Sequence, residues 1–259
     1  MSFLSHVFRF FTTAASWSGP DGILVRLGHH AELSAAAVLA AVLVGVAAGA
    51  LLGHSGRGGF VVVNAANAAR AVPSIALLTL LAIQPAFAGG AGGFLVSFIA
   101  LFALALPPVL TNTYVGVRNV DADVRSAASA MGMNGARVLR QVELPLASPL
   151  VMAGVRTAAV EVVATATLAA YVGFSDLGTY IFAGLATVNT AGPFTGAVEA
   201  FSGALLVAAL ALVTDLGLAA AGRALTPAGV RATGLSRRRF GVGADASTVR
   251  TPQRVSAAT

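Results

Sequence analysis

The stretch DADVRSAASAMGMNGARVLRQVELP, residues 121–145, is the most polar long segment between two apolar blocks of the chain. It predicts two short helices around a glycine. Asp121 is a typical N-cap for the first helix, and Gly132 can end that helix in a left-handed conformation. Asn134 can cap the second helix, and Pro145 is expected to stop it. One face of the first helix is apolar and carries Val124, Ala127, Ala128 and Met131.

The same stretch resembles a signature of bacterial ABC importer permeases of the binding-protein-dependent type, E-A-A-x3-G-x9-I-x-L-P. Every spacing is kept, on Ser126, Ala127, Ala128, Gly132, Val142, Leu144 and Pro145. Val142 replaces Ile conservatively, whereas Ser126 replaces Glu and removes a carboxylate that could pair with a partner. The resemblance implies a MetI-like fold in which this loop couples to a separate ATPase subunit. The alternative is an ordinary capped loop between two spans.

Composition points to the membrane. Hydrophobic residues are 57% of the chain, charged residues only 10%, and the mean hydropathy is +0.84; soluble domains carry roughly 25% charged residues. We therefore expect an all-α integral membrane protein. All 16 basic residues are arginine, and a Walker A phosphate loop needs a lysine. The chain is therefore expected to be no enzyme and to hold no cofactor, with ATP on the partner subunit.

The apolar segments predict one permease domain over residues 34–220, with five transmembrane helices and a coupling loop at 116–148. The spans are 34–52, 60–84, 94–111, 149–172 and 197–220. Gly45 and Gly49 form a small-xxx-small face that allows close helix approach. The second span is expected to kink at Pro73, and the third to end at Pro107-Pro108.

The two ends of the chain lie outside this domain. Residues 1–33 predict an interfacial amphipathic segment, since its first helix places several phenylalanines on one face. A signal peptide is the rival interpretation, which the thin basic region disfavours. Residues 221–259 predict a basic, disordered tail, and residues 173–194 a loop whose apolar part, 178–187, is too short to span.

Arginine placement predicts the orientation. If the coupling loop is cytoplasmic, five spans place the arginines of that loop and of the tail inside, and the N-terminus outside. The loops at 85–93 and 173–194 then lie outside and carry no Arg or Lys. Arg9 and Arg26 are the objection. The expected location is the bacterial cytoplasmic membrane, with the C-terminus cytoplasmic.

Several polar side chains fall within the predicted spans, where they are costly unless they are paired or face a cavity. Arg70 shares a helical face with two asparagines. The candidate substrate path is Asn64, Asn67, Glu161, Thr165, Thr167 and Tyr171. A phenylalanine stripe at residues 94, 98 and 102 is read as packing rather than a cation-π ladder. No catalytic or metal site is expected, since the His29-His30 pair has no second ligand cluster.

Three further strings resemble the osmoprotectant branch of these permeases: residues 112–121, 131–133 and 164–173. This likeness implies import of glycine betaine, carnitine or choline. It also implies an external substrate-binding protein, two ATPase subunits and a second permease subunit, identical or paralogous, with no nucleic acid partner. The alternatives are a methionine or other amino-acid importer of the same fold, and a non-transporting membrane scaffold.

Overall fold

The computed structural model describes residues 2–87, 92–190 and 194–226, and the secondary structure of these residues is helical. The N-terminal part contains α1 (Phe3–Thr12), α2 (Ala14–Trp17), α3 (Ile23–Ser55), α4 (Gly59–Ala69), α5 (Ser74–Ala82) and the 3-10 turn η1 (Pro85–Phe87). The middle contains α6 (Gly92–Arg118), α7 (Ala122–Ala130), α8 (Gly135–Val138) and the π-helical turn η2 (Leu139–Glu143). The last elements are α9 (Leu144–Thr165), the 3-10 segment η3 (Ala166–Val172), α10 (Gly178–Thr187) and α11 (Thr195–Leu225).

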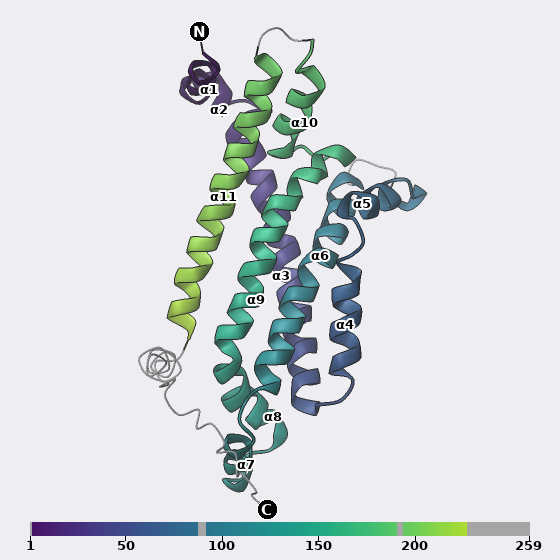
Figure 1. Ribbon diagram of the computed structural model, residues 1–259, viewed down its shortest axis with the longest axis vertical. Coiled ribbons are helices and arrows are strands. Elements are labelled where there is room, and N and C mark those ends of the chain that lie inside the picture. The colour runs from purple at the N-terminus through teal and green to yellow at the C-terminus, as the bar shows by residue number, and fades with distance from the viewer. Residues whose placement is uncertain (1, 88–91, 191–193, 227–259) are drawn as a thin grey trace, which may run out of the picture.

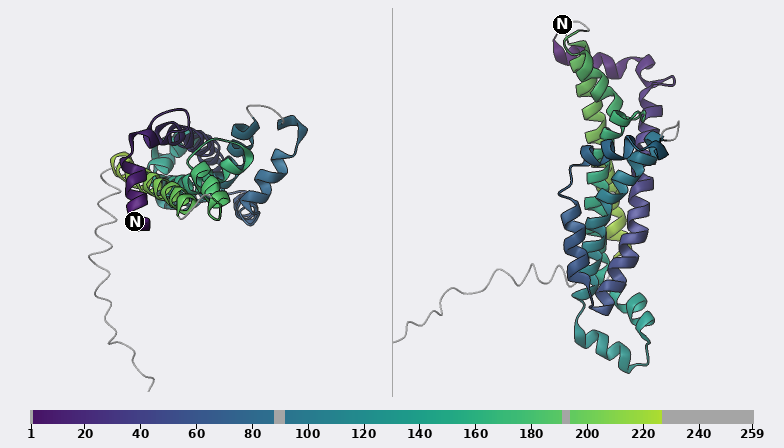
Figure 2. Two further views of the ribbon diagram at one scale, coloured as in Figure 1. Left: turned by 90° about the horizontal axis from the view of Figure 1, so that it is seen from above. Right: turned by 90° about the vertical axis from the view of Figure 1, so that its right-hand side faces the viewer.

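The long helices form an elongated bundle (Figures 1 and 2). Helices α3, α6 and α9 run side by side, α4 lies along α6, and α11 lies along the outside. Helices α7 and α8 project from one end, whereas α1 and α10 lie at the other. Four helical stretches are long and apolar enough to cross a membrane: Ile23–Ser55, Gly92–Arg118, Gly135–Val172 and Thr195–Ala224.

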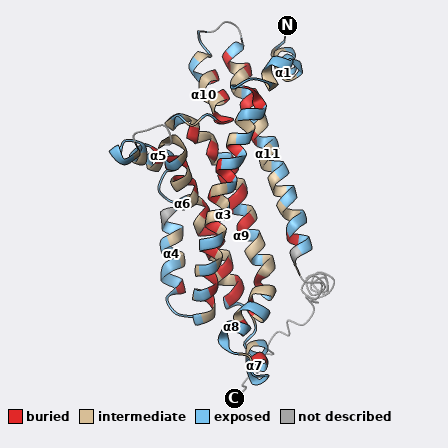
Figure 3. Cartoon of the chain, turned by 180° about the vertical axis from the view of Figure 1, so that it is seen from behind, coloured by how far each residue is buried: buried red, intermediate tan, exposed pale blue. Residues whose placement is uncertain are grey.

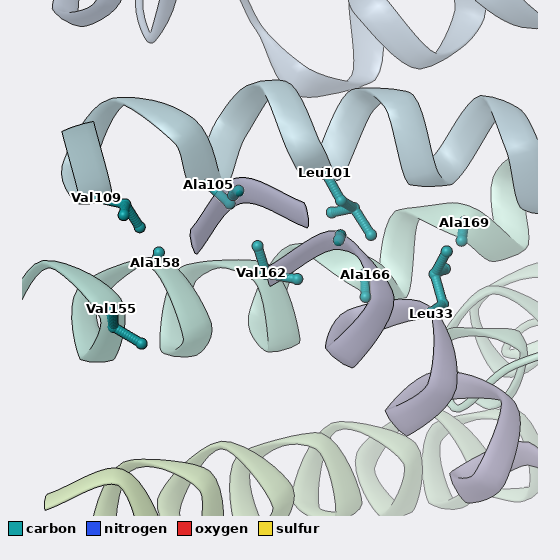
Figure 4. Close-up of a cluster of buried hydrophobic side chains, with 11 residues drawn as sticks. Leu33, Leu101, Ala105, Val109, Val155, Ala158, Val162, Ala166 and Ala169 are labelled. Atoms are coloured by element: carbon teal, nitrogen blue, oxygen red, sulfur yellow. The ribbon is translucent and has the colours of Figure 1, made fainter. Parts of the chain in front are cut away.

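The core of the bundle lies between α3, α6 and α9 and is built from small side chains (Figure 4). Figure 3 shows the buried residues on the facing sides of these helices, with mostly exposed ones on α4 and α11. The predicted close approach at the glycines of α3 is confirmed. A Cβ at Gly45 would lie 2.9 Å from Val109 Cγ1, and one at Gly49 would lie 2.7 Å from the Leu110 carbonyl oxygen. Gly53 continues the same face, so α3 and α6 pack almost backbone to backbone.

The predicted second span, 60–84, is not one kinked helix. It is divided into α4 and α5, which are separated by a turn at residues 70–73. Pro73 is the N-cap residue of α5 rather than a kink within a helix. A proline cannot donate the backbone hydrogen bond that would continue α4, so the chain breaks here instead of bending.

The third predicted span does not end at Pro107-Pro108, because α6 continues through both prolines to Arg118. Both prolines are buried, and the Asn112 side-chain amide donates to the Pro108 carbonyl oxygen at 2.8 Å. Packing against α3 and α9 therefore outweighs the local helix-breaking tendency of proline.

Three other boundaries differ from the sequence prediction. The first long helix begins at Ile23 rather than at residue 34. The predicted loop at 173–194 contains α10, whose glycines allow close packing on α11: a Cβ at Gly184 would lie 2.4 Å from the Gly196 carbonyl oxygen. Helix α11 extends to Leu225, into the predicted tail. The rest of that tail, 227–259, lies outside the described residues.

Candidate functional site

The first coupling helix, α7, has the caps that its sequence predicts. Asp121 Oδ1 accepts a hydrogen bond from the Asp123 backbone N–H at 2.8 Å. Gly132 has a φ of +84°. Its N–H donates to the Ser129 carbonyl, and the next N–H, of Met133, donates to the Ala128 carbonyl. This pair of bonds is the Schellman motif, which ends a helix at a left-handed glycine.

The second coupling helix, α8, begins as predicted but does not stop at Pro145. Asn134 Oδ1 accepts from the Arg137 N–H at 3.0 Å. The chain then forms the π turn η2, in which the Leu144 N–H donates to the carbonyl five residues earlier, that of Leu139. Pro145 follows within the first turn of α9, where a missing N–H is tolerated. The helix therefore continues into the membrane span.

The residues of the matched signature have different exposures. Ser126, Ala127 and Gly132 are exposed, whereas Ala128 is only 3% exposed and packs within this chain. Three others are half-buried: Val142, Leu144 and Pro145. The exposed signature residues therefore lie on one side of α7 and in the turn after it.

A charged cavity lies on the open face of α9, toward α11 and the turn between α4 and α5. Its volume is about 630 Å³, and its lining residues are Arg70, Ala153, Arg156, Thr157, Val160, Glu161, Ala164 and Asp215. The α9 residues among them recur at helical spacing, so one stripe of the helix is polar.

Two ion pairs border this cavity. Arg70 Nη2 lies 3.0 Å from Glu161 Oε2. Arg156 donates from both Nε and Nη2 to Asp215, at 2.7–3.0 Å. The first pair joins the α4–α5 turn to α9, and the second joins α9 to α11. Glu161 is therefore both paired and open to a cavity, the two conditions under which a polar side chain is expected within a span.

The other predicted path residues do not gather at this cavity. Asn64 donates to the Phe60 carbonyl of its own helix, and Asn67 is exposed. Thr167 donates to the Ala164 carbonyl. Tyr171 is exposed, with its ring beside that of Phe182. Thr165 lies half-buried at the end of α9.

The phenylalanine stripe of α6 serves packing. The rings of Phe94, Phe98 and Phe102 stack in succession with centroids 6.3 Å apart. All three pack against the core between α3, α6 and α9.

Sequence reasoning missed three polar contacts between helices. The Arg156–Asp215 pair was not predicted, although Arg156 lies on the same stripe of α9 as Glu161. Glu143 is buried in the coupling segment and pairs with His54. At the other end of the bundle, His30 is buried between Asp176 Oδ2 and the Val163 carbonyl, each at 2.9 Å. Arg156 and Asp215 are isolated polar residues in apolar runs, which is the signal that could have found this pair. His30 and Glu143 have polar neighbours in the sequence, so no such signal marks them.

A tyrosine joins α10 to the segment before α3. The Tyr180 hydroxyl donates to the Asp21 carbonyl oxygen at 2.8 Å, and the Arg26 guanidinium lies 4.6 Å from the centre of its ring. Burial raises the pKa of Tyr180, and the nearby Arg26 opposes this shift in part. The hydroxyl therefore remains a donor at neutral pH.

Known proteins resemble this chain over most of its length. The family of binding-protein-dependent transport system inner membrane components matches residues 41–226. The choline transport system permease protein of Bacillus subtilis is 36% identical over 213 residues, which cover 81% of this chain and 91% of that protein. A carnitine transport permease protein of Listeria monocytogenes is 38% identical, over 81% of this chain and 90% of its own.

Two more matches extend this likeness. The osmoprotectant import permease protein of Salmonella typhimurium is 34% identical, with 79% of this chain and 83% of that protein covered. A crystal structure of an amino acid ABC transporter with histidines aligns with a TM-score of 0.58 over 93% of this chain and 99% of its own. Its sequence identity is 20%, so this last match supports the fold alone.

Proposed function

Because the chain belongs to the family of binding-protein-dependent transport system inner membrane components, we propose that it is a permease subunit of an ATP-driven osmoprotectant importer. Glycine betaine, carnitine and choline are the expected substrates. The observation that carries this proposal is the capped helix pair α7–α8, which holds the signature residues and projects from one end of the bundle (Figure 1).

A separate ATPase subunit docks on this projection. The exposed residues Ser126, Ala127 and Gly132 form the contact surface. The chain has no lysine with which to build a phosphate loop of its own. ATP is therefore bound and hydrolysed on the partner, and closure of two ATPase subunits moves the α7 helices of two permeases in a rigid-body change.

The charged cavity on α9 lines the substrate path. A cavity lined by two arginines and two carboxylates is expensive against lipid, so it faces water or protein. A second permease subunit, identical or paralogous, covers this open face and encloses the path between the two chains. Glu161 and Asp215 are paired with Arg70 and Arg156, so a quaternary ammonium group competes with these arginines for the two carboxylates. The external binding protein performs the first selection of substrate.

The α7–α8 end of the bundle is cytoplasmic. It carries Arg118, Arg125, Arg137 and Arg140, in agreement with the positive-inside rule. The N-terminal helix α1 and helix α10 then lie at the outer face, toward the binding protein.

The similar proteins favour an osmoprotectant over methionine or another amino acid as the substrate. They are choline, carnitine and osmoprotectant permeases that align over about four fifths of this chain. The solved amino acid transporter shares only the fold. A scaffold without transport would not need the polar stripe along α9.

Uptake in a bacterial strain without its own betaine, carnitine and choline importers tests the proposal. The chain is expressed with the ATPase and binding protein encoded beside it, and radiolabelled betaine, carnitine, choline and methionine are supplied in turn. We expect ATP-dependent uptake of at least one of the first three. Uptake of methionine alone, or of none of the four, would refute the proposed function.

A further inference from the structure

Glu143 is a buried carboxylate in the coupling segment. It is 1% exposed and lies in the π turn η2. Its two oxygens face an imidazole and a guanidinium from distant parts of the chain: Oε2 lies 2.7 Å from His54 Nδ1, and Oε1 lies 2.9 Å from Arg125 Nε. A buried carboxylate is strongly unfavourable without such partners. Glu143 therefore depends on both contacts.

Arg125 connects Glu143 to the coupling helix and to the end of α6. It is part of α7, and its Nη2 group donates to the Val117 and Arg118 carbonyl oxygens. These carbonyls belong to the last turn of α6, where few backbone N–H groups remain to bind them. The Val117 carbonyl also accepts from the Val120 N–H at 3.3 Å. The Arg125 Nε–H is not aimed at Glu143 Oε1, so this contact is an ion pair without hydrogen-bond geometry.

His54 connects the same carboxylate to α3. It lies in the last turn of α3, with its side chain about one third exposed. Its other ring nitrogen faces the start of α8, since a Cβ at Gly135 would lie 3.2 Å from Nε2. The imidazole thus fills the space between the end of α3 and the coupling loop.

Helix α7 has little else to hold it in place. It has nine residues, and Ala128 is the residue that it buries. A helix of this length is marginal in water without tertiary contacts. The π turn also affects how the coupling loop is oriented. Its one extra residue rotates the side-chain directions of α8 by about 100° relative to those of α9.

We propose that Glu143 is a positioning residue that fixes the coupling helix α7 to the ends of α3 and α6. When an ATPase subunit displaces α7, the contacts with Arg125 and His54 carry this displacement to both transmembrane helices. Without them α7 moves alone, and ATP is hydrolysed without moving substrate. This inference rests on the proposed function and adds to it a residue outside the matched signature positions.

The test uses the whole importer, reconstituted in proteoliposomes with its ATPase and binding protein. Glu143→Gln keeps the size of the side chain but removes its charge. We expect the variant to insert, to bind the ATPase in the normal ratio and to hydrolyse ATP. The number of substrate molecules moved per ATP should fall about tenfold or more, since a buried ion pair is broken. The control is Glu32→Gln, an exposed carboxylate of α3, which should leave the ratio unchanged.

A double variant separates positioning from folding. Glu143→Gln with Arg125→Gln leaves no uncompensated charge, so the loop keeps its fold but lacks the charged link. We expect it to bind the ATPase and to remain poorly coupled. Normal substrate per ATP in either variant would overturn the inference. So would loss of insertion or of ATPase binding in the double variant, which would make the network a folding element. If the unmodified importer moved no osmoprotectant, the proposed function itself would fail.

Discussion

Arg70 and Glu161 are 91 positions apart in the chain, and Arg70 Nη2 lies within 3.2 Å of both carboxylate oxygens of Glu161. Arg70 belongs to the turn that divides the second predicted span, and Glu161 lies in the last turns of α9. The break in that span therefore has a structural consequence, because it brings a guanidinium to the polar face of α9 and closes one side of the charged cavity.

This ion pair should matter more for transport than for stability. Its side chains are 37% and 27% exposed, so its removal should lower the stability in detergent by about 1 kcal/mol or less. Glu161→Gln and Arg70→Gln should each reduce uptake, and the exchange of the two charges should recover part of it. Asp21→Asn, in an ion pair at the other end of the bundle, is the matched control. Full uptake by Glu161→Leu would show that the carboxylate has no part in the path.

The second pair, Arg156 with Asp215, should hold α11 against α9. Arg156→Lys keeps the charge but loses the forked contact with both carboxylate oxygens. Its loss of thermal stability should be small, about 1 kcal/mol, because both side chains are more than a third exposed. Asp215→Asn should cost more, since the guanidinium stays at the cavity without its anion. Equal melting temperatures for Arg156→Lys and Asp215→Asn would contradict this order.

The glycine face of α3 should tolerate no larger side chain. A Cβ at Gly49 would lie 2.7 Å from the Leu110 carbonyl oxygen and 2.8 Å from Thr113 Cβ. Overpacking of this kind costs about 1–3 kcal/mol. Gly49→Val should therefore lower the melting temperature of the purified chain, whereas Gly217→Val on α11, with open space around it, should not. A similar melting temperature for both variants would mean that α3 and α6 can separate at low cost.

Local signals in the coupling segment were sufficient to predict its geometry. Asp121, Gly132 and Asn134 each act on backbone groups within a few residues, so their effect does not depend on the rest of the fold. The prolines were misjudged for the opposite reason. At Pro108 tertiary packing keeps α6 helical. Before Pro145 the helix forms a π turn, so it continues although Pro145 has no N–H to donate.

Long-range pairs could not be assigned from the sequence. The cost of a carboxylate within a span indicated that Glu161 is paired or faces a cavity, but the identity of its partner depends on where the second span breaks. The same holds for Asp215 and Glu143, each of which is paired with an arginine of another helix. The need for a partner is local, whereas the choice of partner is set by packing.

The proposed orientation is open to a direct chemical test, because the chain has no cysteine. Asn119, at the end of α6, and Asn189, after α10, are both exposed and lie toward opposite ends of the bundle. In intact cells an impermeant thiol reagent should label Asn189→Cys and leave Asn119→Cys unlabelled. Permeabilised cells should show labelling of both. The reverse pattern in intact cells would place the coupling loop outside and remove the basis for ATPase docking.

Gly132 should be the position at which docking is most sensitive to a single substitution. Its φ of +84° is strained for any residue with a Cβ, by roughly 1 kcal/mol or more. Yet nothing lies within 4 Å of where that Cβ would be, so the side chain would point into open space at the end of α7. Gly132→Ala should therefore fold and bind the ATPase with only a modest loss. Gly132→Asp should insert normally but lose the ATPase, because its carboxylate enters the docking surface.

Gly173 offers a matched control for this substitution. It has a φ of +85° and equally open surroundings, but it lies after η3, away from the coupling loop. Gly173→Asp should carry the same backbone strain and keep the ATPase. The measurement is the amount of ATPase that co-purifies with each variant, with substrate uptake measured in parallel. If Gly132→Asp retained both, α7 and its turn would not be the surface through which ATP hydrolysis drives this protein.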